Sequence, residues 1–170
     1  MDTIKTKIKN KNYKYLMPST NSSTIKVQKR DGKLENLDIN KIHFVVEEAC
    51  EGLTGVSSSQ IEMNANIQFY DGMTTKDIQN VLVRSANDLI SLEAPNYQYA
   101  AARLLSYDVR KEAHGQYEYI PLLKLILRNI RSGVYDKGIL DKYSKTEIKK
   151  FNTWIKRDRD LNFTYAGLRQ

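Results

Sequence analysis

The stretch at residues 25–42, "IKVQKRDGKLENLDINKI", predicts two short strands that meet at a tight turn and then lead into a helix. Asp31-Gly32 is a strong turn signal, and apolar residues alternate with polar ones on both sides of it. Because alternation brings every second side chain of a strand to one face, Val27 and Leu37 should point toward the core. We expect these two residues to lie opposite each other.

The same register brings two opposite charges to the face that ought to be buried. Lys29 falls opposite Glu35 across a three-residue loop at 31–33, with one loop residue at positive φ. One interpretation is a cross-strand ion pair worth about 0.2–1 kcal/mol. The other is a pocket in which Lys29 contacts phosphate and Glu35 contacts a hydroxyl or an amine. The hairpin alone leaves both interpretations open.

Helical signals dominate after the hairpin. Capping residues followed by apolar positions at helical spacing predict helices that begin just after Asp38, Thr74, Pro95, Pro121 and Ser144. Cys50 falls on the apolar stripe of the first of these helices with no base or cation beside it, and is therefore expected to be a core residue. The segment 57–69 is ambiguous, because its apolar residues alternate as in a strand while three serines resemble a helix cap.

Lys111 falls on the inward stripe of the helix that begins near Pro95. A lysine is costly to bury without a partner, although its side chain could also extend to solvent at the helix end and complement the dipole there. Lys29 and Lys111 both interrupt apolar faces, and one polyphosphate would satisfy both. The two interpretations are equally supported by the residues. Neither a P-loop nor a Rossmann glycine motif is present in the chain.

Composition sets outer limits on what the chain can be. Its 170 residues suffice for one domain, or for a small domain with part of another. The single Cys excludes an internal disulfide or a Cys-rich zinc site and fits a reducing cytoplasm. No secretory signal is predicted, and no apolar run approaches the roughly 20 residues that a membrane span needs.

The net charge of +7 invites a nucleic-acid interpretation, but the excess is concentrated at one end. Residues 1–23 hold five Lys and one Asp, which leaves 22 basic and 19 acidic residues and a net charge of +3 elsewhere. We expect a basic flexible tail at 1–23 rather than a nucleic-acid arm.

Four segments resemble the ATP-cone, the nucleotide-sensing regulatory domain of ribonucleotide reductases. They are "VQKRDGKLENLDINKI", "IQFYDGMTTKDI", "APNYQYAAARL" and "RKEAHGQYE", and the resemblance covers residues 24–115. Further on, "GVYDKGIL" and "RDRDLNFTYAG" look like the N-terminal helical region of the class I large subunit. The resemblance thus divides the chain into a tail at 1–23, an ATP-cone at 24–115 and the start of the reductase helical region at 116–170.

The resemblance implies an α+β fold that is mostly α: a four-helix bundle capped by a small three-stranded sheet, followed by a helical extension. It favours a helix in the ambiguous segment 57–69 and makes residues 73–75 a short third strand. In the family, ATP raises activity and dATP switches it off through changes in subunit assembly. It therefore implies ATP or dATP as an allosteric effector, together with Mg²⁺.

The resemblance also carries over site residues, position by position. Lys29 and Lys111 would contact phosphates and Thr75 would lie near the nucleoside, where it could also cap its helix. Arg30 and Arg110 are adjacent basic candidates. The remaining matched positions form one run: Glu35, Asn36, Leu37, Asp38, Ile39, Asn40 and Lys41.

What the resemblance implies about function is the regulatory portion of a ribonucleoside-diphosphate reductase large subunit, which serves deoxyribonucleotide synthesis for DNA replication. The family's catalytic cysteines lie beyond this stretch and Cys50 aligns with a core position. We therefore expect a truncated or split chain with no catalytic residue, no metal site and no activity by itself. The expected partners are the rest of the large subunit and the radical-generating small subunit, without a membrane or nucleic acid. The alternatives are a basic nucleic-acid-binding helical protein and a degenerate cone that binds no nucleotide.

Overall fold

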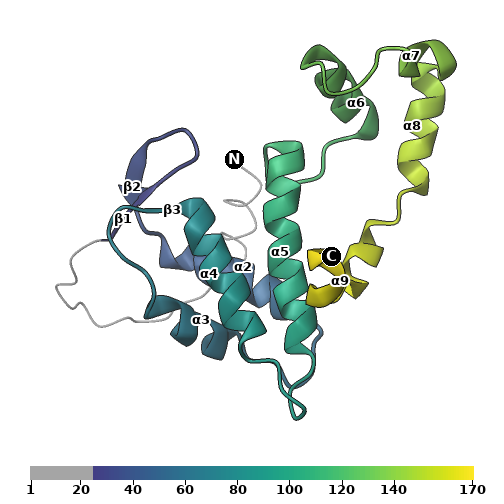
Figure 1. The fold of residues 1–170 in the computed structure, drawn as a ribbon. Helices are drawn as coiled ribbons and strands as arrows, with labels where there is room; N and C mark the ends of the chain where they lie inside the picture. The colour runs from purple at the N-terminus through teal and green to yellow at the C-terminus, as the bar shows by residue number, and fades with distance from the viewer. Residues whose placement is uncertain (1–24) are drawn as a thin grey trace.

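The computed structural model describes residues 25–170, and the predicted tail at 1–23 lies outside the described residues. A small sheet sits at one end of a bundle of helices, with the long helix α5 near the middle of the molecule (Figure 1). The elements of this part are β1 (Lys26–Gln28), β2 (Leu34–Asn36), α2 (Ile39–Cys50), α3 (Ser58–Asn66), β3 (Met73–Thr74), α4 (Thr75–Asn87) and α5 (Tyr97–His114). The strand order is β2-β1-β3, with β2 antiparallel and β3 parallel to β1.

The hairpin between β1 and β2 turns through a three-residue loop at 30–32, one residue earlier than predicted. The N–H of Lys29 donates to the carbonyl of Lys33 at 2.8 Å, and Gly32 has a φ of +83°. Three-residue hairpin loops end on a residue in the left-handed region, and only glycine adopts it without a Cβ clash. The loop therefore ends on Gly32, and the predicted loop at 31–33 is wrong.

The earlier loop moves the strand register by two residues. Val27 lies opposite Glu35, so the predicted pairing of Val27 with Leu37 is wrong. The predicted pairing of Lys29 with Glu35 is wrong for the same reason. A slip of two residues leaves every side chain on its own face of the sheet. Lys29 and Glu35 therefore still share a face as diagonal neighbours, and their side chains form an ion pair of 2.6 Å.

The ambiguous segment at 57–69 is a helix, as the resemblance implied. Ser57 caps α3 with its side-chain oxygen. The third strand is also present but is one residue shorter than the predicted 73–75, because its last predicted residue begins α4. The N-cap of α4 is Thr74, whose hydroxyl oxygen accepts from the N–H of Asp77 at 3.0 Å, as the sequence predicted.

The bundle of α2, α3, α4 and α5 is packed around the apolar stripes that the sequence indicated. Its most buried members include Val46, Ile61 and Leu104, which have essentially no exposed surface. Alanines on the buried face of α5 let the neighbouring helices approach, and α5 packs on both α2 and α4. One buried polar side chain, Gln79, donates to the carbonyl of Leu104 at 2.8 Å and is thereby satisfied.

The helical extension that follows leaves the bundle and then returns to it (Figure 1). Ser144 and Glu147 form the capping box that the sequence predicted. Helix α6 packs on α8, while the last two elements pack back on α5. The extension contains α6 (Leu122–Arg131), α7 (Ile139–Lys142), α8 (Lys145–Trp154), η1 (Arg157–Asn162) and α9 (Tyr165–Arg169).

The architecture confirms the predicted fold class, α+β and mostly α. A four-helix bundle carries a three-stranded sheet at one end, and a helical extension follows. Within residues 25–170, no helix combines the length and the apolar character that crossing a membrane requires.

Candidate functional site

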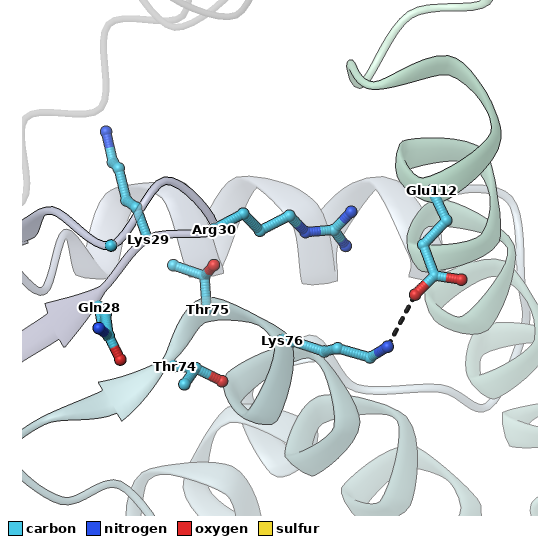
Figure 2. A pocket seen from close by; sticks show the side chains of 8 residues that line it. Gln28, Lys29, Arg30, Thr74, Thr75, Lys76 and Glu112 are labelled. Atoms are coloured by element: carbon cyan, nitrogen blue, oxygen red, sulfur yellow. Dashed lines mark hydrogen bonds and ion pairs between the residues drawn. The ribbon is translucent and has the colours of Figure 1, made fainter. Parts of the chain in front are cut away.

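A surface pocket of about 470 Å³ lies where the hairpin, the first residues of α4 and the last turns of α5 meet (Figure 2). Three of its lining residues, Lys29, Arg30 and Thr75, belong to the predicted site. The full lining consists of Gln28, Lys29, Arg30, Gly32, Thr74, Thr75, Lys76 and Glu112. The volume is in the range of small-ligand sites, and the lining is unusually basic for one.

Each of the three cations that line the pocket is paired with a carboxylate. Lys29 meets Glu35 at 2.6 Å. The other two reach across to α5, where Arg30 pairs with Asp108 and Lys76 pairs with Glu112, each at 2.7 Å. Figure 2 shows the side chains of Arg30 and Lys76 extending toward α5 from different elements, whereas the Lys29 side chain points away from that helix.

Lys111 lies on the same part of α5 but does not line the pocket. Burial lowers the pKa of its ammonium group, the charge of Arg30 lowers that pKa further, and Asp108 acts in the opposite direction. In the described part of the chain, no carboxylate lies within ion-pair distance of Lys111. The side chain is thus a partly buried cation close to Arg30, in need of an anion.

The predicted run from Glu35 to Lys41 lies where the hairpin leads into α2 and does not line the pocket. Asp38 caps α2 by accepting from the N–H of Asn40 at 3.1 Å, and the ammonium group of Lys41 lies 3.5 Å from the Asp38 carboxylate and 4.0 Å from that of Glu35. Ile39 begins α2 and is exposed. Of the other members, Asn36 ends β2, while Leu37 packs against the core and donates its N–H to the Ile25 carbonyl.

Arg110, the remaining basic candidate, is turned away from the pocket. Its guanidinium carbon lies 4.7–4.9 Å from the ring centres of three tyrosines: Tyr107, Tyr117 and Tyr119. The hydroxyl of Tyr117 donates to Glu48 and that of Tyr119 donates to Asp160 in η1. Arg110 therefore lies on the side of α5 toward the extension, whereas Asp108 pairs with Arg30 of the hairpin and Glu112 pairs with Lys76 of α4.

Sequence reasoning missed Gln28, Lys76, Asp108 and Glu112. Two of them carry a usable signal, because Asp108 and Glu112 lie one helical turn apart and Asp108 shares a face with Lys111. Lys76 has only its position beside Thr75 at the start of α4. Nothing in the local pattern indicates that its partner is on α5.

Cys50 lies at the last position of α2, partly buried against the core. Burial raises the pKa of its thiol to about 11, and Glu62 and Glu47 add to that rise. The expectation that no cation lies nearby is wrong, because the charge of Arg103 acts to lower this pKa. Burial outweighs it, so the group is a thiol at neutral pH.

Comparison with known proteins shows which family has this arrangement. Residues 25–112 match the ATP cone domain, and the chain belongs to that family. Among full-length relatives, it is 45% identical over 144 residues to ribonucleoside-diphosphate reductase 1 subunit alpha of Escherichia coli (strain K12), covering 85% of this chain. It is 40% identical over 146 residues, or 86% of this chain, to ribonucleoside-diphosphate reductase subunit alpha of Enterobacteria phage T4. The corresponding subunit of Helicobacter pylori is 36% identical over 145 residues, again 85% of this chain.

The chain spans only 18–19% of the length of these three relatives. Its similarity to them runs past the ATP-cone into the helical extension, because the aligned stretch of about 145 residues is longer than the 25–112 match. Family and relatives together favour a regulatory N-terminal portion of a ribonucleoside-diphosphate reductase large subunit over a nucleic-acid-binding protein.

Proposed function

We propose that this chain binds ATP and dATP as allosteric effectors at the hairpin end of the bundle, on behalf of a ribonucleoside-diphosphate reductase. The observation that carries the proposal is that three elements bring cations to this end of the bundle. Lys29, Arg30 and Lys76 line the pocket, and Lys111 of α5 lies near Arg30 just outside the lining. A polyphosphate supplies several charge-assisted contacts at once and is the ligand best matched to such a group.

The proposal gives each side chain a role. Lys29 and Lys111 contact phosphates, and binding gives the partly buried Lys111 the direct ion pair that no carboxylate of residues 25–170 provides. Thr75 lies at the start of the 13-residue helix α4, where the helix dipole also favours an anion, and contacts the nucleoside. The run from Glu35 to Lys41 adds polar contacts at the hairpin's exit. We assign residues 24–115 to the nucleotide unit and 116–170 to the start of the reductase helical region.

Magnesium fits this site as a companion of the phosphates. Within residues 25–170, no group of three or more His, Cys, Asp or Glu side chains is arranged to hold a metal ion. Mg²⁺ commonly keeps several waters and binds through substrate phosphates with one or two carboxylates, so it needs no protein cage.

The partners in this proposal are the remainder of a reductase large subunit and the radical-generating small subunit, in the cytoplasm. The allosteric role is to report the ATP-to-dATP ratio to that assembly. Ribonucleotide reduction itself belongs to the remainder, because the thiol of Cys50 is partly buried and has a raised pKa.

Isothermal titration calorimetry on the full chain tests the binding step. We expect saturable binding of dATP and ATP in the presence of Mg²⁺, with CTP as the control for base specificity. The absence of heat with both adenine nucleotides would leave a cone that packs but binds nothing. A parallel titration with duplex DNA at rising salt checks the rival function, since nucleic-acid binding through surface lysines weakens steeply with salt.

A further inference from the structure

Two carboxylates of α5 already pair with cations that line the pocket: Glu112 lines the pocket itself, and Asp108 lies just outside its lining. Asp108 and Glu112 lie one turn apart on α5 and hold Arg30 and Lys76, each at 2.7 Å. Arg30 comes from the hairpin, 78 residues away in sequence from its partner. Arg30 and Lys76 therefore already have an anion beside them, and that anion belongs to the protein.

The Arg30–Asp108 pair is the more consequential of the two. The Asp108 side chain is only 12% exposed, whereas both members of the Lys76–Glu112 pair are more than half exposed. Exposed ion pairs contribute little because water and salt screen them, and a pair with a nearly buried member is screened much less. Asp108 also acts on Lys111, which is close enough to sense both Asp108 and Arg30.

A phosphate that approaches Arg30 and Lys111 meets the Asp108 carboxylate, which is paired with Arg30 and close enough to act on Lys111. Two anions a few ångströms apart repel each other, and the repulsion is stronger where one of them is largely shielded from water, as Asp108 is. The guanidinium of Arg30 can turn from the carboxylate to the phosphate, since its side chain is 44% exposed at the pocket (Figure 2). Effector binding then exchanges one charge-assisted contact for another instead of adding one.

We propose that Asp108 is an internal competitor of the effector: its carboxylate neutralises Arg30 in the empty site and has to be displaced from it when a phosphate binds. This inference rests on the proposed function, because it concerns the same site. It assigns Asp108 a role in setting effector affinity. It also makes the Arg30–Asp108 ion pair a tether between the hairpin and α5 that the effector releases.

The test is the affinity of Asp108→Asn for dATP, measured by calorimetry on the full chain beside the wild type. The substitution keeps the shape of the side chain and removes its charge. We expect binding to tighten by roughly three- to tenfold. Asp141→Asn, at an exposed position of α7, is the matched control for the loss of one negative charge and should leave the affinity unchanged.

A double-substitution cycle isolates the link to Arg30. In an Arg30→Met background the gain from Asp108→Asn should shrink, because the competition for the guanidinium no longer exists. Inorganic tripolyphosphate in place of dATP should give the same ranking, since the competition concerns phosphate and not the base. Circular-dichroism melting of every variant shows whether each is folded. Glu112→Gln, which removes the charge of the more exposed carboxylate, should tighten dATP binding less than Asp108→Asn does.

The outcomes separate this inference from the proposed function. If the wild type binds dATP and Asp108→Asn binds it equally or more weakly, the proposed function stands and the competitor role is overturned. If only Asp108→Asn binds, the competitor role is supported in its strongest form. If neither protein binds dATP or ATP, the proposed function fails and this inference fails with it.

Discussion

Arg110 of α5 lies with its guanidinium carbon 4.7 Å from the ring centre of Tyr119, in the segment that leads out of the bundle. The guanidinium carbon of Arg157 in η1 lies 4.4 Å from the centre of the same Tyr119 ring. One tyrosine is thus held by a cation from the bundle and by another from the extension. Because Arg110 and Lys111 are neighbours on α5, this helix carries both one candidate phosphate contact and the attachment of the extension.

Replacing Arg110 by Met should destabilise the protein. The change removes the cation from three tyrosine rings but keeps most of the side-chain volume, and a desolvated cation–π contact is worth about 2 kcal/mol. Urea denaturation should give a loss of about 1–2 kcal/mol in the free energy of unfolding. Arg84→Met, at an exposed position of α4, is the control and should change stability by no more than about 0.5 kcal/mol. Equal losses in the two variants would contradict the role of the tyrosine cluster.

Replacing Lys111 by Ala should weaken dATP binding at least tenfold. A charge-assisted contact to phosphate is worth about 1.5–3 kcal/mol, and about 1.4 kcal/mol corresponds to a factor of ten. Calorimetry on the full-length variant measures the effect, with Lys124→Ala on the exposed side of α6 as the charge-matched control. Wild-type affinity in Lys111→Ala would remove this residue from the site.

Effector binding should weaken at alkaline pH because of Lys111. Burial and the charge of Arg30 place its pKa below the ordinary 10.5, so Lys111 loses its proton, and its attraction for phosphate, before an exposed lysine does. The affinity ratio of wild type to Lys111→Ala should therefore already fall as the pH rises toward 10.5, the ordinary pKa of lysine. A ratio that stays constant over this range would contradict the shift.

The same shift predicts the opposite trend for the stability of the empty protein. Between the lowered pKa of the folded state and 10.5, the unfolded chain holds the Lys111 proton that the folded chain has lost. Stability rises with pH wherever the unfolded state binds more protons, so this group contributes a rise across that window. The urea midpoint of the wild type minus that of Lys111→Ala should rise with pH across this window, since the other titrating groups cancel in the difference.

Shortening Ile61 to Ala should cost about 2–5 kcal/mol of unfolding free energy. Ile61 has no exposed surface and fills the core between α3 and its neighbours, so the substitution removes apolar contacts and leaves a cavity. Met63→Ala in the same helix is the control, because Met63 is 67% exposed and should change stability by less than about 0.5 kcal/mol. Chemical denaturation of both variants checks the difference, and a Met63 effect as large as that of Ile61 would contradict the packing of α3.

The thiol of Cys50 should react slowly while the chain is folded. Burial raises its pKa to about 11, so very little thiolate is present at about pH 8. Modification by iodoacetamide should be slow in buffer and much faster in urea.

Residues 1–170 alone should also fail to reduce any ribonucleoside diphosphate, even with a radical-generating subunit and a thiol reductant. Turnover that is abolished by Cys50→Ser would overturn both expectations.

Local chemistry made much of the fold predictable from the sequence. Helix starts at Thr74 and Ser144 followed from caps whose side chains bond within three residues, and these bonds depend on no distant part of the chain. The loop at 30–32 could not be placed, because two registers a pair of residues apart bury the same faces. The left-handed φ of Gly32 decides between them.

The candidate site was only partly within reach of the sequence. Arg30 and Thr75 could be named because a resemblance supplied their positions, and Lys29 could be named from the hairpin's alternation as well. All three line the pocket. Lys111 could be named on its helical spacing as well. The carboxylates that pair with these cations could not be named from the sequence. An ion pair between residues 78 positions apart leaves no trace in any local pattern.

The sequence by itself determined the two hairpin strands and most of the longer helices, with the faces they bury, because capping, apolar periodicity and glycine placement act over a few neighbouring residues. The tertiary structure alone decided that Asp108 meets Arg30 and that Arg110 turns to the tyrosines instead of the pocket. Adjacent residues on a helix point about 100° apart, so which of them faces the hairpin depends on how α5 is rotated against its neighbours. That rotation is fixed by the packing of the whole bundle.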